Sequence, residues 1–211
     1  SFGETHIICA VKQDAFRVVQ DFEGAIAEYT GALHVVTTNS CTAALLLAFG
    51  WYVKNGGTKI AMPSRTYPSV PMSAYHAGLD VELIDFKWSG VYSMPPSNII
   101  DCAKRFTNGM YEKGSVQCTS FHAAKLLKIG QGGAILHDDA EADTWYRRMR
   151  FDGRTEGLQT TEDTFPEAGY HCYMSPDAAA RGLWLMQSYP VHMPDQPMCE
   201  YPDMSRWSWT R

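Results

Sequence analysis

The stretch HVVTTNSCTAALLLAFGWYV, residues 34–53, predicts a strand, a polar turn and a helix in immediate succession. His34 to Thr37 is a short β-branched run typical of a buried strand, and Asn39-Ser40 marks the turn after it. The apolar residues from Thr42 to Val53 then predict a helix that ends at Asn55-Gly56-Gly57. A strand that leads through a tight turn into a helix is the unit from which helix-covered sheets are built.

The same alternation continues on both sides of this unit. Residues 16–29 carry apolar side chains at helical spacing, and Gly31 follows them. We expect strands at 59–62, 81–84, 98–100, 117–120 and 134–137, and helices at 68–76, 140–151 and 177–188. The predicted fold class is therefore α/β, a mainly parallel sheet with helices on both faces.

Two segments depart from this pattern. Between residues 85 and 99, glycine and proline interrupt the chain and leave no room for a full helix, so the crossover is unusually short. Residues 189–211 contain four prolines and are too few for a second domain. We therefore expect one domain over residues 1–188 and an extended C-terminal arm over residues 189–211, packed on the domain or on a partner.

Composition argues against several functional classes. The chain has 211 residues, 45% of them hydrophobic, which is enough for one core, and its net charge of −5 argues against nucleic-acid binding. The cysteines form no C-x-x-C pair and the histidines no H-E-x-x-H motif, so we expect no metal site. No apolar run approaches the roughly 20 residues that span a bilayer. We expect a soluble, cytoplasmic protein with reduced thiols and no membrane partner.

One lysine lies in a setting with chemical meaning. The run Thr119-Ser120-Phe121-His122-Ala123-Ala124-Lys125 is followed by Gly130-Gln131-Gly132-Gly133. A lysine amine can bond to a carbonyl cofactor, the serine can contact a phosphate, and the glycines allow a tight turn. Asp101, at the end of a predicted strand, offers a carboxylate to a pyridinium nitrogen. These are the components of a pyridoxal phosphate site.

Each component also has a purely structural explanation. The amides of Cys41 and Thr42 can hold an anion at a helix N-terminus, but Ser40 can equally be an ordinary N-cap. Tyr67 can stack on a planar ring or belong to the core or its rim. Asp101 can be functional or can pair with a nearby arginine. The lysine, taken alone, is an ordinary surface residue, and it is the ordered set that favours a site.

In this order the motifs resemble those of the DegT/StrS family of sugar aminotransferases, which are fold-type I pyridoxal phosphate enzymes. The resemblance runs from about residue 16 to residue 188, and its most specific part is Ser120-Phe121-His122 followed by Lys125 and the glycine turn. The other matches, weak one by one but correctly ordered, are Phe22-Glu23, Tyr29-Thr30-Gly31, Ser40 to Leu45, Pro63-Ser64, Thr66-Tyr67, Ala77-Gly78, Asp85, Asp101-Cys102-Ala103, Gly169-Tyr170 and Asp177-Ala178-Ala179.

The resemblance implies a role for each site residue. It implies that Lys125 bonds to the aldehyde of pyridoxal phosphate and later moves a proton, that Asp101 keeps the pyridine nitrogen protonated, and that Tyr67 stacks on the ring. Other positions are implied to contact the cofactor, mostly at its phosphate: Ser40, Cys41, Thr42, Lys104, Ser120 and, shared between the subunits of a homodimer, His171.

The function implied is transfer of an amino group from glutamate or glutamine to a keto group of a nucleotide-linked sugar, as in polysaccharide biosynthesis.

The chain departs from the family pattern at three positions: His171 replaces an asparagine, Cys41 a glycine, and Lys104 a glutamine or histidine. The short crossover omits about one strand–helix unit, and the small C-terminal domain is largely missing. An alternative is therefore a reduced homologue that keeps the fold for cofactor binding or dimerisation without turnover. A nucleotide-binding protein without pyridoxal phosphate is less favoured, because no G-x-G-x-x-G motif is present.

Overall fold

The computed structural model describes residues 14, 16–197 and 200–207. The expected helices and strands all form, within a few residues of their predicted ends, and one further strand, β4, was not predicted from the sequence. The helices are α1 (Arg17–Thr30), α2 (Cys41–Lys54), α3 (Ser69–His76), α4 (Ala140–Arg150), α5 (Pro176–Met186) and the 3-10 turn η1 (Met204–Arg206). The strands are β1 (His34–Thr38), β2 (Lys59–Pro63), β3 (Asp80–Ile84), β4 (Tyr92–Ser93), β5 (Ile99–Asp101), β6 (Val116–Ser120) and β7 (Gly133–His137).

The strands form a five-stranded sheet in the order β1-β7-β6-β5-β4 and a two-stranded sheet of β2 and β3. The predicted α/β class is confirmed, but the strand directions are mixed rather than mainly parallel. Only β5–β6 and β2–β3 pair in parallel, whereas β1–β7, β6–β7 and β4–β5 are antiparallel. The loops before β7 and β5 return the chain directly beside the preceding strand, so β7 runs against β6 and β5 runs against β4. The connection from β5 to β6 also lacks a helix, but it crosses over and these two strands are parallel.

The short connection between β3 and β5 also joins the two sheets. It contains β4 and no helix, and its Pro95 carbonyl accepts a hydrogen bond from the Ala61 amide of β2 at 2.8 Å. The segment around β4 therefore lies between β5 and β2.

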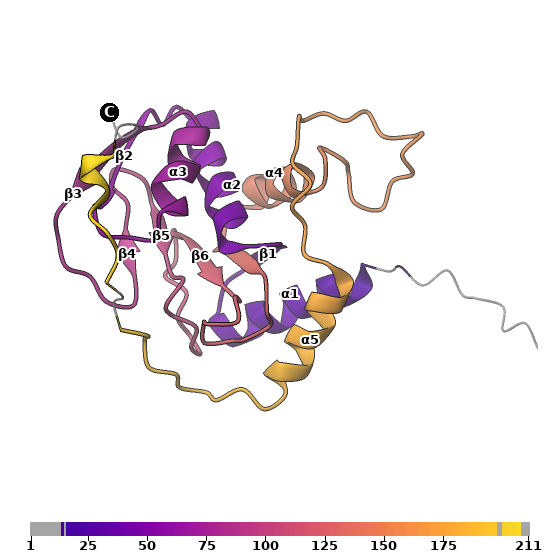
Figure 1. Cartoon of the computed structure of the whole chain (residues 1–211). Coiled ribbons are helices and arrows are strands. Elements are labelled where there is room, and N and C mark those ends of the chain that lie inside the picture. The colour runs from indigo at the N-terminus through magenta and orange to yellow at the C-terminus, as the bar shows by residue number, and fades with distance from the viewer. Residues whose placement is uncertain (1–13, 15, 198–199, 208–211) are drawn as a thin grey trace, which may run out of the picture.

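Helices cover both faces of the sheet, as predicted. Alternate residues of β1 point to opposite sides: Val36 packs in a core cluster with α2, α3 and α4, and Val35 in a second cluster with α1 and α5. Figure 1 shows α2 and α3 above the sheet and α1 and α5 below it. None of the helices in the described part of the chain has both the length and the apolar character that a membrane crossing requires.

The C-terminal arm packs on its own domain. From α5 it runs along the lower edge of the molecule and rises to η1 beside β3 (Figure 1). The Tyr29 hydroxyl donates to the Pro190 carbonyl at 2.7 Å, the Asn108 amide donates to the Val191 carbonyl at 3.1 Å, and Met204 is fully buried. Ser208 and Trp209 of the predicted arm, and the first 13 residues of the predicted domain, lie outside the described residues.

Candidate active site

The turn between β1 and α2 presents a helix N-terminus to a cavity of about 510 Å³. Ser40 is the N-cap of α2, and its hydroxyl oxygen accepts from the Ala43 amide at 3.2 Å, so the predicted cap exists. The amides of the first turn have no acceptor within the helix, and together with the helix dipole they favour a bound anion. Ser40, Cys41 and Thr42 all line the cavity. The cap and the anion site are therefore compatible, because the cap accounts for only one of these amides.

Gly133 explains how the turn comes so close to the sheet. A β-carbon at this position would lie 2.4 Å from the Cys41 nitrogen and 2.6 Å from the Ser40 carbonyl carbon, and both are backbone atoms. Any larger residue at the start of β7 would push α2 away. The glycine turn of the sequence motif thus serves the anion-binding turn as well as the lysine loop.

The lysine loop, residues 121–132, connects β6 to β7 and is fastened by its own backbone. The Phe121 amide donates to the Gly132 carbonyl at 2.9 Å, and the Lys125 amide donates to the His122 carbonyl at 2.8 Å. Gly130 and Gly132 have φ angles of 119° and 155°, which a residue with a side chain rarely adopts. Lys125 is half-buried and lines the cavity, whereas Lys128, three residues further on, is exposed and does not.

Asp101, the last residue of β5, lies 6% exposed at the same cavity. Its Oδ2 accepts from the Tyr92 hydroxyl at 2.7 Å, and its Oδ1 accepts from the Ala103 amide at 2.8 Å. Burial raises the pKa of the carboxyl above its ordinary value, while these two donors and the charges of Lys125 and Lys104 oppose the rise. The carboxylate and the lysine amine thus face one cavity and interact electrostatically.

The remaining predicted residues of this cavity differ in exposure and contacts. Tyr67 is 58% exposed, and its ring contacts the Tyr201 ring edge-on, with the centroids 6.2 Å apart. Ser120 is nearly buried at the end of β6. Lys104 is also buried, and its ammonium donates to the Pro197 carbonyl of the arm at 2.5 Å. Lys104 therefore links the cavity to the C-terminal arm, a connection that the sequence did not suggest.

His171 is the one predicted site residue that lies away from this cavity. It follows the excursion of residues 152–170, which projects from the upper right of the molecule in Figure 1. Its side chain is 70% exposed, and Nδ1 lies 2.9 Å from Asp152 Oδ2. The other eight predicted residues line one cavity, whereas His171 does not.

Several residues at the cavity were missed from the sequence. Ser69 begins α3, and its hydroxyl lies 2.8 Å from the Thr42 hydroxyl. Gln131 lies inside the glycine turn, so its position in the motif was a usable signal. Gln196 and Tyr201 come from the arm, more than 60 residues from the lysine loop, and no local pattern predicts such contacts.

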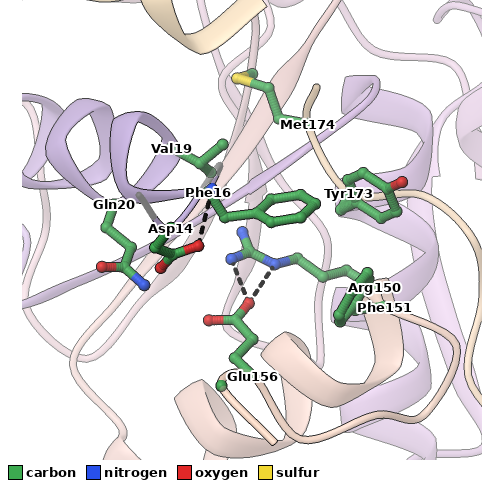
Figure 2. Close-up of a pocket in the computed structure, with 10 residues that line it drawn as sticks. Asp14, Phe16, Val19, Gln20, Arg150, Phe151, Glu156, Tyr173 and Met174 are labelled. Atoms are coloured by element: carbon green, nitrogen blue, oxygen red, sulfur yellow. Dashed lines mark hydrogen bonds and ion pairs between the residues drawn. The ribbon is translucent and has the colours of Figure 1, made fainter. Parts of the chain in front are cut away.

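A second cavity, of about 450 Å³, lies between the start of α1 and the end of α4. Figure 2 shows Arg150 and Glu156 bonded to each other at its edge, with Phe16 and Tyr173 beside them. Arg150 also donates to the Thr37 carbonyl and to Glu23. Arg150 and Glu156 are therefore paired within the protein, and no lysine is among the described residues that line this cavity.

Comparison with known proteins identifies relatives of this chain. The chain is 24% identical over 212 residues to the UDP-4-amino-4,6-dideoxy-N-acetyl-β-L-altrosamine transaminase of Campylobacter jejuni, with 78% of this chain and 55% of that protein covered. It is 23% identical to the GDP-perosamine synthase of Caulobacter vibrioides, with 84% and 58% covered. The chain thus spans little more than half the length of these relatives.

The fold is shared with solved structures. The sugar aminotransferase CalS13 of Micromonospora echinospora superposes with a TM-score of 0.70 at 19% identity, covering 82% of this chain and 60% of that one. Spr1654 of Streptococcus pneumoniae, solved in a pyridoxal phosphate form, superposes with a TM-score of 0.64 at 18% identity, covering 82% and 59%. Residues 12–110 and 99–191 match the sequence profile of one family. The chain belongs to the DegT/DnrJ/EryC1/StrS aminotransferase family.

Proposed function

We propose that this chain binds pyridoxal phosphate and transfers an amino group from glutamate or glutamine to a keto group of a nucleotide-linked sugar. One observation carries the proposal: the Lys125 amine, the Asp101 carboxylate and the N-terminus of α2 border the same cavity. Pyridoxal phosphate requires an amine for its aldehyde, a carboxylate for its cationic ring nitrogen and an anion site for its phosphate. The family membership and the transaminase relatives support the same reaction class.

The residues present fit the cofactor. The N-terminal turn of α2, with the hydroxyls of Thr42 and Ser120, would hold the phosphate, because these donors converge on a helix dipole that favours an anion. Tyr67 would cover one face of the ring. Asp101 has one bond on each oxygen and keeps lone pairs for a ring N–H. Burial raises the pKa of the Cys41 thiol well above its ordinary value, so this thiol stays neutral beside the turn.

When bound, pyridoxal phosphate supplies an aldehyde and an electron-withdrawing ring that can hold an amino group and pass it on. Lys125 would hold the cofactor through its Nζ, and the same atom would take up and release a proton. The backbone hydrogen bonds of the 121–132 loop hold Lys125 at the cavity. Asp101 would accept a hydrogen bond from the ring nitrogen, because its Ala103 and Tyr92 donors and the charges of Lys125 and Lys104 favour the ionised carboxylate against the effect of burial.

The proposal extends to the assembly and its location. We propose a homodimer whose two copies share each site, because His171 lies exposed on the projecting segment instead of at the cavity of its own chain. We also propose a cytoplasmic location, supported by the free thiols of Cys41, Cys102, Cys118 and Cys172. Light scattering of the purified protein with and without cofactor tests the dimer.

Substitution of Lys125 tests the proposed chemistry. The wild-type chain with added pyridoxal phosphate should show an absorbance band near the visible edge that borohydride bleaches and that glutamate or glutamine shifts. Lys125→Ala should lose the band, and Lys128→Ala, which removes an exposed lysine three residues away, should keep it. A wild type without the band would refute cofactor binding through Lys125. A band that neither amino acid shifts would refute transamination and favour the non-catalytic homologue.

A further inference from the structure

Tyr92 reaches Asp101 from the connection that the sequence marked as abbreviated. The two-residue strand β4 pairs antiparallel with β5, and in this register Tyr92 stands directly opposite Asp101. Its ring is 4% exposed, and its hydroxyl donates to Asp101 Oδ2 at 2.7 Å. Register, burial and hydrogen bond thus place this side chain behind the carboxylate that faces the cavity.

The direction of the hydrogen bonds follows from the number of protons. A tyrosine hydroxyl has one proton, and Tyr92 gives it to the carboxylate, which can only accept when ionised. The Thr66 hydroxyl lies 2.6 Å from the Tyr92 oxygen and must therefore be the donor in that pair. The hydrogen bonds therefore run in one direction: Thr66 donates to Tyr92, and Tyr92 donates to Asp101. All three residues are buried.

The segment between β3 and β5 is held in place by Trp88, and this keeps the hydrogen bonds of Thr66, Tyr92 and Asp101 intact. The Trp88 indole nitrogen donates to the Arg65 carbonyl at 2.9 Å, next to Thr66 in the chain. The Trp88 ring packs on the Tyr92 ring with the centroids 4.8 Å apart. Burial and the neighbouring Asp101 charge raise the pKa of Tyr92 well above its ordinary value, so the donor keeps its proton at any working pH.

We propose that Tyr92, supported by Thr66, is a positioning residue that holds the Asp101 carboxylate ionised and aimed at the ring nitrogen of pyridoxal phosphate. This inference rests on the proposed function. Without a donor on Oδ2, the carboxylate would be held only by the Ala103 amide on Oδ1 and, being buried, would take up a proton more readily. A neutral carboxyl would no longer pair with a cationic ring nitrogen.

Tyr92→Phe tests the inference by binding, without turnover. The dissociation constant of the variant is measured for two probes, pyridoxal phosphate and its analogue with the ring nitrogen replaced by C–H. Loss of one hydrogen bond to a charged group predicts about tenfold weaker binding of pyridoxal phosphate. The analogue, which offers Asp101 no N–H, should bind both proteins equally. Tyr111→Phe, which removes a hydroxyl bonded to the Ser115 carbonyl away from the cavity, is the matched control.

Two further measurements separate positioning from simple packing. In an Asp101→Asn background, Tyr92→Phe should have no additional effect on cofactor binding. As pH falls, Tyr92→Phe should lose cofactor affinity at a higher pH than the wild type, because a carboxyl without this donor takes up its proton earlier. Thr66→Val should show the same pattern with a smaller loss. Circular dichroism checks whether Tyr92→Phe folds. If it does not, Thr66→Val serves as the test variant in its place.

The outcomes are distinct. An equal loss for both probes would overturn the inference and make Tyr92 a packing residue, and unchanged affinity for pyridoxal phosphate would overturn it as well. Tight binding of both probes by the wild type with the selective loss in the variant would support it. If the wild type binds neither probe, the proposed function itself fails and the inference fails with it.

Discussion

Glu23→Gln should destabilise the protein strongly, because Glu23 is the anion of a buried network. The side chain is 5% exposed on α1. Its Oε1 accepts from the Thr37 amide at 2.9 Å and from the Thr37 hydroxyl at 2.8 Å, and its Oε2 accepts from Arg147 at 2.7 Å. Arg150, 3% exposed, donates to Oε1 as well. The network ties α1 and α4 to the end of β1, three residues before the N-cap of α2.

The magnitude follows from what the substitution leaves behind. Glutamine keeps the size of the glutamate side chain but removes its charge, and its amide N–H₂ group faces the donors that the carboxylate had accepted from. Removing one partner of a buried ion pair typically costs about 3–5 kcal/mol. Here the lower end applies, because Arg150 keeps Glu156 and Arg147 keeps Asp143. A loss of about 3 kcal/mol is a large part of the roughly 5–15 kcal/mol by which domains are stable.

The loss should also depend on pH in one direction. Burial raises the pKa of Glu23, but the charges of Arg150 and Arg147 and the Thr37 amide outweigh it, so the pKa lies below its ordinary value of 4.5. A carboxyl with a lowered pKa in the folded state stabilises the protein above its unfolded-state pKa, and this stabilisation disappears as pH falls through the folded-state value. The difference between wild type and Glu23→Gln should therefore be full near pH 7 and shrink below about 4.5.

Urea unfolding followed by circular dichroism measures the effect, with the slope of the transition compared to check that both proteins unfold alike. Glu28→Gln is the control, because Glu28 lies on the same helix and is exposed. The expected result is a lower midpoint for Glu23→Gln only. A Glu23→Gln protein as stable as Glu28→Gln at pH 7 would refute the reasoning, and so would a difference that persists undiminished at pH 3.

Two other predictions test the walls of the cavity. Gly133→Ala should shift the start of α2 and weaken the binding of pyridoxal phosphate, because its β-carbon would lie 2.4 Å from a backbone atom. Gly24→Ala is the control, because a β-carbon there has nothing within 4 Å and cofactor binding should not change. A binding titration compares the two variants. Asp195→Asn should loosen the arm, because the carboxylate accepts from Arg105 at 2.9 and 2.7 Å. Hydrogen exchange at the Gln196 amide should then accelerate, whereas exposed Glu200→Gln should leave it unchanged.

The regular elements were predictable because their signals are local. Apolar spacing marks α1, and a strand followed by a capping serine marks β1 and α2, so a short window holds the whole pattern. Strand direction is not local: whether β7 runs with or against β6 depends on how the connecting loop packs, and the expectation of a mainly parallel sheet was wrong for that reason. β4 was not predicted, because a strand of two residues shows no periodicity.

The candidate site divides in the same way. Asp101 and Ser120 end strands, and Ser40 and Lys125 lie in the loops that follow strands, so the sheet brings them to one cavity once the strand order is set. Tyr92 could not be recognised, because its contact with Asp101 depends on the register of β4. The position of Lys104 was predicted, but its bond to the Pro197 carbonyl requires knowledge of where the arm runs.

The two sides of the cavity have different structural origins, and this bears on what distinguishes the chain from its relatives. The anion turn, the carboxylate and the lysine lie on backbone that core packing fixes from both faces of the sheet. The opposite wall is made by Gln196, Pro197 and Tyr201, held by side-chain bonds between segments about 90 residues apart. Substitutions in that wall cost little core packing, so it can change without loss of the fold. For the amino-group transfer proposed above, selection among acceptors should therefore depend on the arm far more than on the strand ends, which have to meet the fixed demands of a ring, an aldehyde and a phosphate.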